Sequence, residues 1–527
     1  MTMKISIPSL LAIAVAVLFA VLPLPSSAAQ NPVIYADVPD MAIIRVGDTY
    51  YMSSTTMHMS PGLPIMKSKD LVSWQLASYA YDTLDDIDEL NLNNGKNAYG
   101  QGSWASSLRY HDGTFYASTF SGTTDKMYVY TTKDIEKGSW KKTSFKPALG
   151  DHSIFFDNDG RVYLIYGGGT IMLSELNSDA SAIKPGGVNQ VIISDASAPA
   201  GTDIALKAEG SQMFKVNGKY YLFNITWPRN GMRTVVIHRA DKITGPYEGR
   251  VALQDKGVAQ GGLIDTPQGE WFAYLFRDYG AVGRIPYLVP VKWEDGWPVL
   301  GVDGKVPDTV NLPVSTGTVP GIVATDEFNR RSGEPALPLV WQWNHNPNNK
   351  LWSITRHPGF LRLSTGRVDA EILSARNTLT QRTFGPECSG TTAIDTTHMK
   401  NGDVAGLALF QKNYGTVGVQ VKDGRKYIVM VSAESGSPVE MQRIPLGRKT
   451  VFLKADADFR DRVDTARFFY SLDGKSWTPI GASLKMAYTF PHFMGYRFGL
   501  FNYATKTPGG SADFDFFRVS DPLSAAK

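Results

Sequence analysis

Cysteine is almost absent from this sequence: Cys388 is the single one among 527 residues. No disulfide can therefore form within the chain, and the fold must be stabilised by packing instead. We interpret Cys388 as a small buried apolar residue rather than a nucleophile.

An excess of charge of one sign is also lacking. The 53 Lys and Arg residues nearly balance the 50 Asp and Glu residues, which leaves a net charge of +3, and no long basic run occurs. Nucleic acids and membrane surfaces attract proteins through clustered basic charge. The composition therefore predicts neither of them as a partner and favours a neutral substrate.

Long apolar runs are confined to the N-terminus. Residues 10–24 form an apolar run that contains Pro23, which is shorter than the roughly 20 residues that span a bilayer. Lys4 precedes this run and the small residues 26–29 follow it. This pattern predicts a signal peptide over residues 1–29, cleaved near Ala29, and a secreted or periplasmic protein. An uncleaved membrane anchor is the alternative, which the short run disfavours.

A 3.6-residue apolar period is missing from every long stretch, so helices should be few, whereas Gly, Tyr, Phe and Trp are abundant. An internal repeat is present instead: a short apolar strand, a turn with Gly or Asp, and a second strand that usually opens with aromatic residues. Each copy is typical of a β-hairpin. The five copies are residues 43–51, 108–116, 154–163, 213–221 and 263–272.

The spacing of these copies indicates the architecture. They begin about 45 to 65 residues apart, which leaves room for four short strands in each unit. We therefore predict an all-β protein with a five-bladed β-propeller over residues 30–305. A β-sandwich with five accidentally similar hairpins is the weaker alternative.

Aligned on the second strand of each hairpin, the copies have Pro39, Trp104, Asp151, Glu209 and Gln260 eleven positions upstream, and Asp40 follows Pro39. Equivalent positions of a propeller lie on one ring, so these side chains should converge near the axis. Taken singly, each acidic residue would be read as a turn residue or an exposed one. Their shared position predicts a sugar pocket with an aromatic platform and convergent polar groups.

The same region resembles glycoside hydrolase family 43. The matching segments are residues 38–40, 43–48, 104–105, 151–153, 155–156, 208–210 and 283–286. The resemblance implies Asp40 as general base, Glu209 as general acid and Asp151 as the residue that tunes and orients the acid. It also implies Arg284 as a substrate-binding residue. The blade alignment identifies Trp104 and Gln260 as two further candidates for binding the sugar.

The chemistry of inversion agrees with these roles. One carboxylate deprotonates water and an opposed carboxylic acid protonates the leaving oxygen, with the two about 6.5 to 9.5 Å apart. We expect an exo-acting enzyme that releases terminal α-L-arabinofuranose or β-D-xylose from plant hemicellulose or pectin side chains. Two alternatives remain open: a non-catalytic carbohydrate-binding propeller, and a retaining five-bladed glycosidase of the invertase type.

The rest of the chain is expected to form a second domain. Residues 306–325 have the Pro, Gly, Val, Ser and Thr composition of a linker, and residues 326–527 resemble the concanavalin-like β-sandwich that follows the propeller in relatives. This domain should cover one side of the propeller mouth, with residues 501–503 as the candidate segment that reaches into the pocket.

Metal and cofactor expectations are limited. No cofactor is required by the chemistry above, and Ala259 stands where many family relatives have a histidine beside a central metal, so no calcium is predicted in the propeller axis. Asp326 with Asp513 or Asp515 could form a structural calcium site in the sandwich, although the pattern favours acidic turn residues as their explanation. Met57 is expected at an apolar pocket wall or in the core.

Overall fold

The computed structural model describes residues 28–313 and 321–520. The predicted signal peptide therefore lies outside the described residues, apart from its last two positions. Among the residues described, no helix has the length and apolar character needed to cross a membrane.

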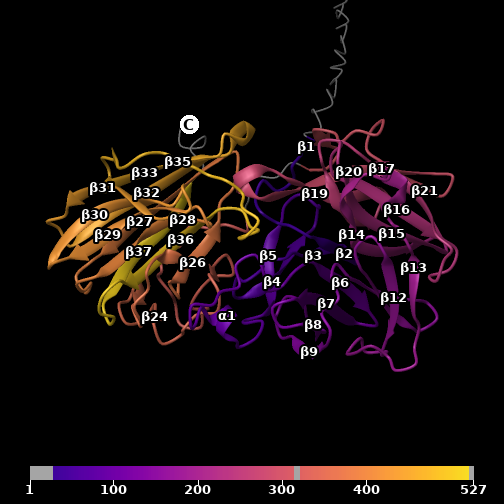
Figure 1. Ribbon diagram of the computed structural model, residues 1–527, viewed down its shortest axis with the longest axis horizontal. Coiled ribbons are helices and arrows are strands. Elements are labelled where there is room, and N and C mark those ends of the chain that lie inside the picture. The colour runs from indigo at the N-terminus through magenta and orange to yellow at the C-terminus, as the bar shows by residue number, and fades with distance from the viewer. Residues whose placement is uncertain (1–27, 314–320, 521–527) are drawn as a thin grey trace, which may run out of the picture.

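The N-terminal domain consists of five four-stranded antiparallel sheets, each formed by four consecutive strands (Figure 1). This confirms the predicted five-bladed propeller. The blades are β2 (Ala42–Val46), β3 (Thr49–Ser53), β4 (Gly62–Ser68) and β5 (Gln75–Tyr81); β6 (Ser106–His111), β7 (Thr114–Ser121), β8 (Lys126–Thr132) and β9 (Lys141–Phe145); β10 (Ser153–Phe156), β11 (Val162–Tyr166), β12 (Ile171–Leu176) and β13 (Asn189–Ile193); β14 (Ile204–Val216), β15 (Lys219–Pro228), β16 (Thr234–Ala240) and β17 (Glu248–Leu253); and β18 (Ala259–Asp265), β19 (Trp271–Asp278), β20 (Arg284–Glu294) and β21 (Trp297–Leu300).

Each predicted hairpin forms the first two strands of a blade. In the second blade, His111 pairs with Thr114 across a turn in which Gly113 has φ of 72°, a left-handed conformation that glycine adopts without strain. The first strands β2, β6, β10, β14 and β18 each contact the next one, and β18 contacts β2, which closes the ring. Residues within these strands or just before them therefore lie around the propeller axis.

The segment after the last blade returns to the start of the described chain. Strand β22 (Thr309–Val310) pairs with β1 (Ala29–Gln30) in a two-stranded sheet. The backbone N–H of Ala29 also donates to the Leu312 carbonyl at 3.0 Å. This pairing anchors residues 309–312 to the propeller before the chain enters the second domain.

The C-terminal domain is a sandwich of two antiparallel sheets, as predicted. One sheet has the order β23 (Gln342–Trp343), β26 (Leu379–Arg382), β36 (Arg497–Ala504), β28 (Asp403–Phe410), β29 (Gly415–Lys422), β30 (Arg425–Ser432) and β31 (Val439–Pro445). The other has the order β24 (Trp352–Ser353), β25 (Leu361–Ser364), β37 (Ser511–Ser520), β27 (Glu387–Asp395), β32 (Thr450–Asp458), β33 (Thr465–Ser471) and β34 (Thr478–Pro479), with β35 (Leu484–Lys485) also paired to β33.

Burial in the sandwich follows the two-residue period of strands. In β32, Val451, Leu453, Ala455 and Ala457 are buried, whereas their neighbours are more exposed. Cys388 in β27 is fully buried, as expected for an apolar residue. Helix is rare among the described residues, which hold one α-helical turn, α1 (Asp88–Asn91), and four short 3-10 turns at Ala198–Ala200, Gly280–Val282, Ile372–Ser374 and Arg460–Arg462.

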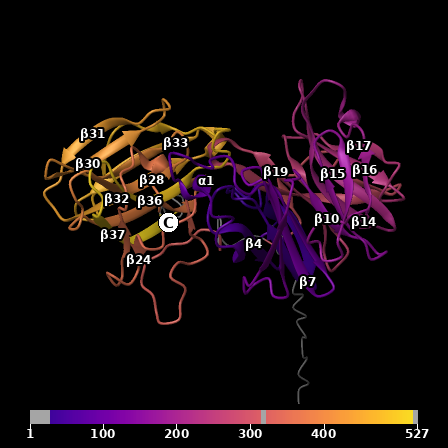
Figure 2. The same ribbon diagram turned by 60° about the horizontal axis from the view of Figure 1, so that its bottom comes forward.

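The two domains lie side by side with direct contact between them (Figures 1 and 2). Trp343 and Ser60 exchange two backbone hydrogen bonds of 2.6 and 3.0 Å, so a sandwich segment pairs with the first blade. The turn α1 also contacts the sandwich, because the Asn346 N–H donates to the Leu90 carbonyl at 2.8 Å. One hydrophobic core continues from the first, fourth and fifth blades into the sandwich.

Candidate active site

A cavity of about 680 Å³ opens at the propeller axis, and all six predicted site residues line it. These residues are Asp40, Trp104, Asp151, Glu209, Gln260 and Arg284. They come from four different blades and from the segment that leads into the first. The blade alignment therefore brought together residues that are far apart in the sequence.

The equivalence of blades extends to the backbone. Asp40, Asp151 and Gln260 have φ values of 52°, 51° and 56°, which lie in the left-handed region. Non-glycine residues are uncommon in this region. Three of them around one ring show that the same backbone constraint recurs from blade to blade. Gly210 also has a positive φ, of 67°, and a Cβ at this glycine would lie 2.9 Å from the Gln260 side chain. Glycine thus allows Gln260 to pack over the segment that carries Glu209.

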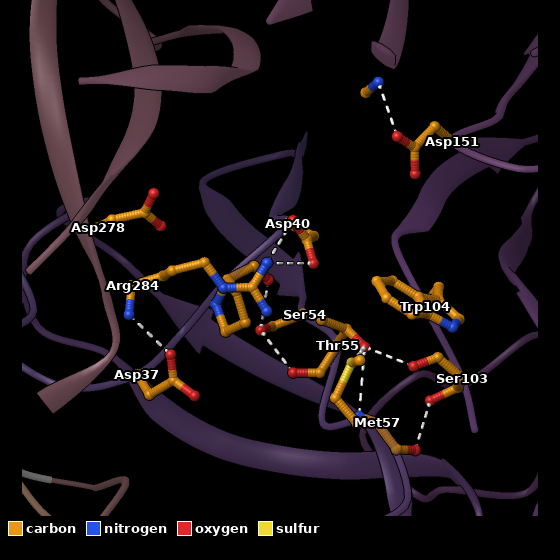
Figure 3. A network of polar contacts seen from close by, with 12 residues as sticks. Asp37, Asp40, Ser54, Thr55, Met57, Ser103, Trp104, Asp151, Asp278 and Arg284 are labelled. Atoms are coloured by element: carbon orange, nitrogen blue, oxygen red, sulfur yellow. Dashed lines mark hydrogen bonds and ion pairs between the residues drawn. The ribbon is translucent and has the colours of Figure 1, made fainter. Parts of the chain in front are cut away.

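Asp40 is held by Arg284 in a buried ion pair (Figure 3). The guanidinium Nη1 donates to both carboxylate oxygens at 3.0 Å, and both side chains are at most 5% exposed. Burial raises the pKa of Asp40, and the adjacent Arg284 charge opposes that effect. Nε and Nη2 of Arg284 are buried without a hydrogen-bond partner in the protein, so they are donors that a substrate hydroxyl could satisfy.

Asp151 and Glu209 form the acidic half of the cavity. Asp151 Oδ2 accepts a hydrogen bond from the Gly210 N–H at 3.2 Å, which places its carboxylate next to the residue that follows Glu209. Burial raises the pKa of Glu209 to about 8, and the charges of Asp151 and Asp40 act in the same direction. Burial and the Asp40 charge likewise raise the pKa of Asp151. A protonated carboxyl group and an ionised one can therefore coexist in this cavity near neutral pH.

Aromatic rings form the walls. The Trp104 ring stacks on Phe120 at a centroid distance of 6.3 Å and packs on Phe493 at 5.3 Å. Trp227 and Phe490 also line the cavity and are 38% and 71% exposed. Apolar ring faces of this kind suit the C–H faces of a sugar.

The sandwich contributes a different segment from the one expected. Phe490 and Phe493, in the loop between β35 and β36, line the cavity, whereas the expected residues 501–503 do not. Phe501 and Asn502 lie within β36, which is paired on both sides with β26 and β28, and both are buried. Phe501 packs with Phe410 in a cluster that Tyr99 of the propeller also contacts, and this cluster lies apart from the cavity, so that prediction was wrong. Met57 is buried in a cluster that packs against Trp104 and Phe493.

Two of the three carboxylates considered for calcium have other partners. Asp326 forms an ion pair with Arg330 at 2.6 Å, and Asp513 forms one with Arg362 at 2.6 Å. Within residues 28–313 and 321–520, no group of three or more His, Cys, Asp or Glu residues is arranged to hold a metal ion. Asp326 and Asp513 therefore serve as ion-pair residues here.

Besides Phe490 and Phe493, the sequence analysis missed two polar or exposed aromatic residues of the propeller, Arg233 and Trp227. Arg233 of the fourth blade lines the cavity and forms an ion pair with Asp278 of the fifth at 2.7 Å. Its charge lowers the pKa of Glu209, against the larger raising effects. Trp227 lies at the end of β15, the strand that forms a hairpin with the Glu209 strand β14. Its backbone pairs with Leu206 of β14. Its position on the strand opposite Glu209 is a signal that the hairpin register could have revealed.

Comparison with known proteins gives the family. Residues 29–298 match the model of glycosyl hydrolases family 43, and residues 325–520 match that of the beta xylosidase C-terminal concanavalin A-like domain. A beta-xylosidase of Formosa agariphila is 31% identical, with 92% of this chain and 89% of the relative covered. A non-reducing end alpha-L-arabinofuranosidase of Bacteroides ovatus is 27% identical, with coverage of 80% and 79%.

Solved structures agree. The chain superposes on a bifunctional GH43-CE protein of Bacteroides eggerthii with a TM-score of 0.93 and 65% identity, over 94% of this chain. It spans 64% of the length of that protein, so it matches only part of it. The family models, the curated relatives and the cavity lead to one conclusion: the chain belongs to glycosyl hydrolase family 43 and is a glycoside hydrolase.

Proposed function

We propose that this enzyme releases single pentose residues, α-L-arabinofuranose or β-D-xylose, from the nonreducing ends of plant hemicellulose or pectin side chains, with inversion at the anomeric carbon. The observation that carries the proposal is the convergence of Asp40, Asp151 and Glu209 in one aromatic-walled cavity. The names of the relatives, beta-xylosidase and alpha-L-arabinofuranosidase, support a pentose as the sugar released.

In this proposal Asp40 acts as the general base. Its carboxylate takes a proton from a water molecule, which attacks the anomeric carbon from the face opposite the leaving group. The ion pair with Arg284 favours the ionised form of Asp40, against its burial. The unpartnered Nε and Nη2 of Arg284 would donate to hydroxyl groups of the bound pentose.

Glu209 acts as the general acid and gives its proton to the departing glycosidic oxygen. Its raised pKa keeps it protonated at neutral pH, as an acid catalyst requires. Asp151 tunes the acid through its charge and orients it, because it is hydrogen-bonded to the adjacent Gly210 N–H. Trp104 and Gln260 complete the proposed contacts with the nonreducing sugar.

The test has two parts. Aryl α-L-arabinofuranoside, aryl β-D-xyloside or both should release the phenol, and proton NMR of the first sugar formed should show the anomer opposite to that of the substrate. With defined oligosaccharides, free pentose should appear before any long fragment. No turnover on any pentoside would favour a binding protein, and a product of unchanged configuration would favour the retaining alternative.

We also propose that the enzyme acts after export, because residues 1–29 have the pattern of a signal peptide. N-terminal sequencing of the protein recovered from the periplasm or medium should give a start near Gln30. Recovery of the intact N-terminus in the cytoplasm would contradict export.

A further inference from the structure

Asp37, three residues before the proposed base, has no role in the chemistry above, yet its carboxylate contacts both domains. Oδ1 accepts a hydrogen bond from the Arg284 backbone N–H at 2.7 Å. Oδ2 accepts one from the backbone N–H of Gly495 in the sandwich at 3.1 Å. The side chain is 7% exposed, so both contacts are shielded from water.

On the propeller side, Asp37 fixes the residue that holds the base. Arg284 is bound at its two ends, with its backbone N–H on Asp37 and its guanidinium on Asp40 (Figure 3). The Val38 N–H also donates to the Arg284 carbonyl at 2.9 Å. A Cβ at Gly283, which has φ of 102°, would lie 2.3 Å from Asp37 Oδ1. Glycine is therefore required for the carboxylate to come this close.

On the sandwich side, Asp37 fixes the loop that forms the aromatic wall. Gly495 ends the segment that carries Phe490 and Phe493 into the cavity. The Phe493 ring lies 4.8 Å from the Arg284 guanidinium. A Cβ at Gly495 would lie 2.2 Å from the Val282 carbonyl oxygen, so this part of the loop is in close contact with the propeller backbone.

We propose that Asp37 is a positioning residue that couples the sandwich loop 488–495 to the Asp40–Arg284 pair, so that the aromatic wall and the base are placed together. A single carboxylate accepts one N–H hydrogen bond from each domain. The absence of a Cβ at Gly283 and at Gly495 allows the two backbones to come this close. The inference rests on the proposed function for the role of Asp40, whereas the contacts of Asp37 themselves do not depend on it.

The test variant is Asp37→Asn. Its amide nitrogen cannot accept a hydrogen bond, so one of the two N–H groups is left unpaired. Loss of a buried charged hydrogen bond should lower kcat/KM on an aryl pentoside by about tenfold or more. Amide hydrogen exchange in loop 488–495 should become faster, and this second readout does not require any activity.

The pH profile gives a third readout. Asp40 faces Arg284, Asp37 and Asp278, and its charge acts on Asp151, Glu209 and Tyr488. Removing the Asp37 charge takes away one of the repulsions that raise the pKa of Asp40. The acidic limb of the kcat/KM profile should therefore move to lower pH.

Two matched variants separate coupling from the loss of a buried charge between the domains. Asp464→Asn alters another carboxylate that bridges the domains, because Asp464 Oδ2 accepts a hydrogen bond from the Ala281 N–H at 3.2 Å. The amide oxygen of asparagine can still accept this hydrogen bond, so the melting temperature, kcat/KM, the pH profile and the exchange of loop 488–495 should all stay close to the wild-type values. Gly495→Ala displaces the loop and retains the Asp37 charge, so it should speed exchange and lower kcat/KM with the acidic limb unmoved.

The proposal is overturned if Asp37→Asn leaves the exchange of loop 488–495 at the wild-type rate, or if it behaves as Asp464→Asn does in all three readouts. Should Asp37→Asn fail to fold, Gly495→Ala decides: wild-type kcat/KM with faster exchange would show that the loop does not act on the site. A wild-type protein without pentosidase activity would defeat the proposed function, and the exchange experiment would still test Asp37.

Discussion

Replacing Asp151 with asparagine removes a negative charge beside Glu209 and nearly preserves the shape of the side chain. The amide oxygen can still accept the hydrogen bond from the Gly210 N–H. Burial is the largest cause of the raised pKa of Glu209, and the Asp151 charge is the next. An opposite charge at close range shifts a carboxyl pKa by about one to three units, and a like charge acts in the other direction. Since burial and Asp40 are unchanged, the pKa of Glu209 should fall by about one to two units from its value of about 8.

The sign of the effect on rate follows from the role of Glu209. An acid catalyst works only when protonated, so a lower pKa shifts the alkaline limb of the profile to lower pH. The assay is kcat/KM against pH with an oligosaccharide substrate, whose poor leaving group needs the acid. Asp151→Asn should lose rate mainly at neutral and higher pH and change least near pH 5. An alkaline limb that stays in place or moves to higher pH would refute the proposed tuning role.

Three further predictions follow from the same cavity. Phe490→Ala removes a ring that is 71% exposed, so KM for oligosaccharides should rise by about threefold to tenfold while the melting temperature stays constant. Arg284→Met leaves Asp40 buried without its partner, and urea unfolding should show a loss of about 3–5 kcal/mol. The pKa of Glu209 is raised from 4.5 to about 8 in the folded state, so its contribution to stability is complete below about pH 4.5 and is lost as the pH rises from there to about 8. Glu209→Gln should therefore melt increasingly higher than wild type between pH 5 and pH 8, and a constant difference over that range would contradict this.

The propeller could be predicted because its signals are local and repeated. A strand, a turn with glycine and a second strand recur five times, and the period fixes which residues occupy the ring. The convergence of Trp104, Asp151, Glu209 and Gln260 in one cavity could then be predicted, because they occupy the same position of the repeat. Even the left-handed backbone of Asp151 and Gln260 repeats with the blade.

The contribution of the sandwich could not be predicted in the same way. The sequence shows that Phe501 and Tyr503 are aromatic, but not that they pack in the cluster of Phe410, apart from the cavity. The loop that carries Phe490 and Phe493 has no period, and its position depends on how the domains dock. The contact of Arg233 with Asp278 likewise joins two blades through side chains whose directions the hairpin pattern does not specify.

The assignment of acid and base gives a final prediction, which depends on the bond that each carboxyl group helps to make or break. Glu209 protonates the leaving oxygen, so its loss matters most when the leaving group is a sugar alkoxide. Glu209→Ala should nearly abolish cleavage of natural oligosaccharides and retain appreciable activity on an aryl glycoside, whose phenolate departs without a proton. Asp40 activates water whatever the leaving group, so Asp40→Asn should depress both substrates alike. The measurement is the ratio of kcat/KM for the two substrates in each variant. Because any damage to a cavity lowers activity, the contrast between the ratios is the test, and equal ratios would show that the two roles are wrongly assigned.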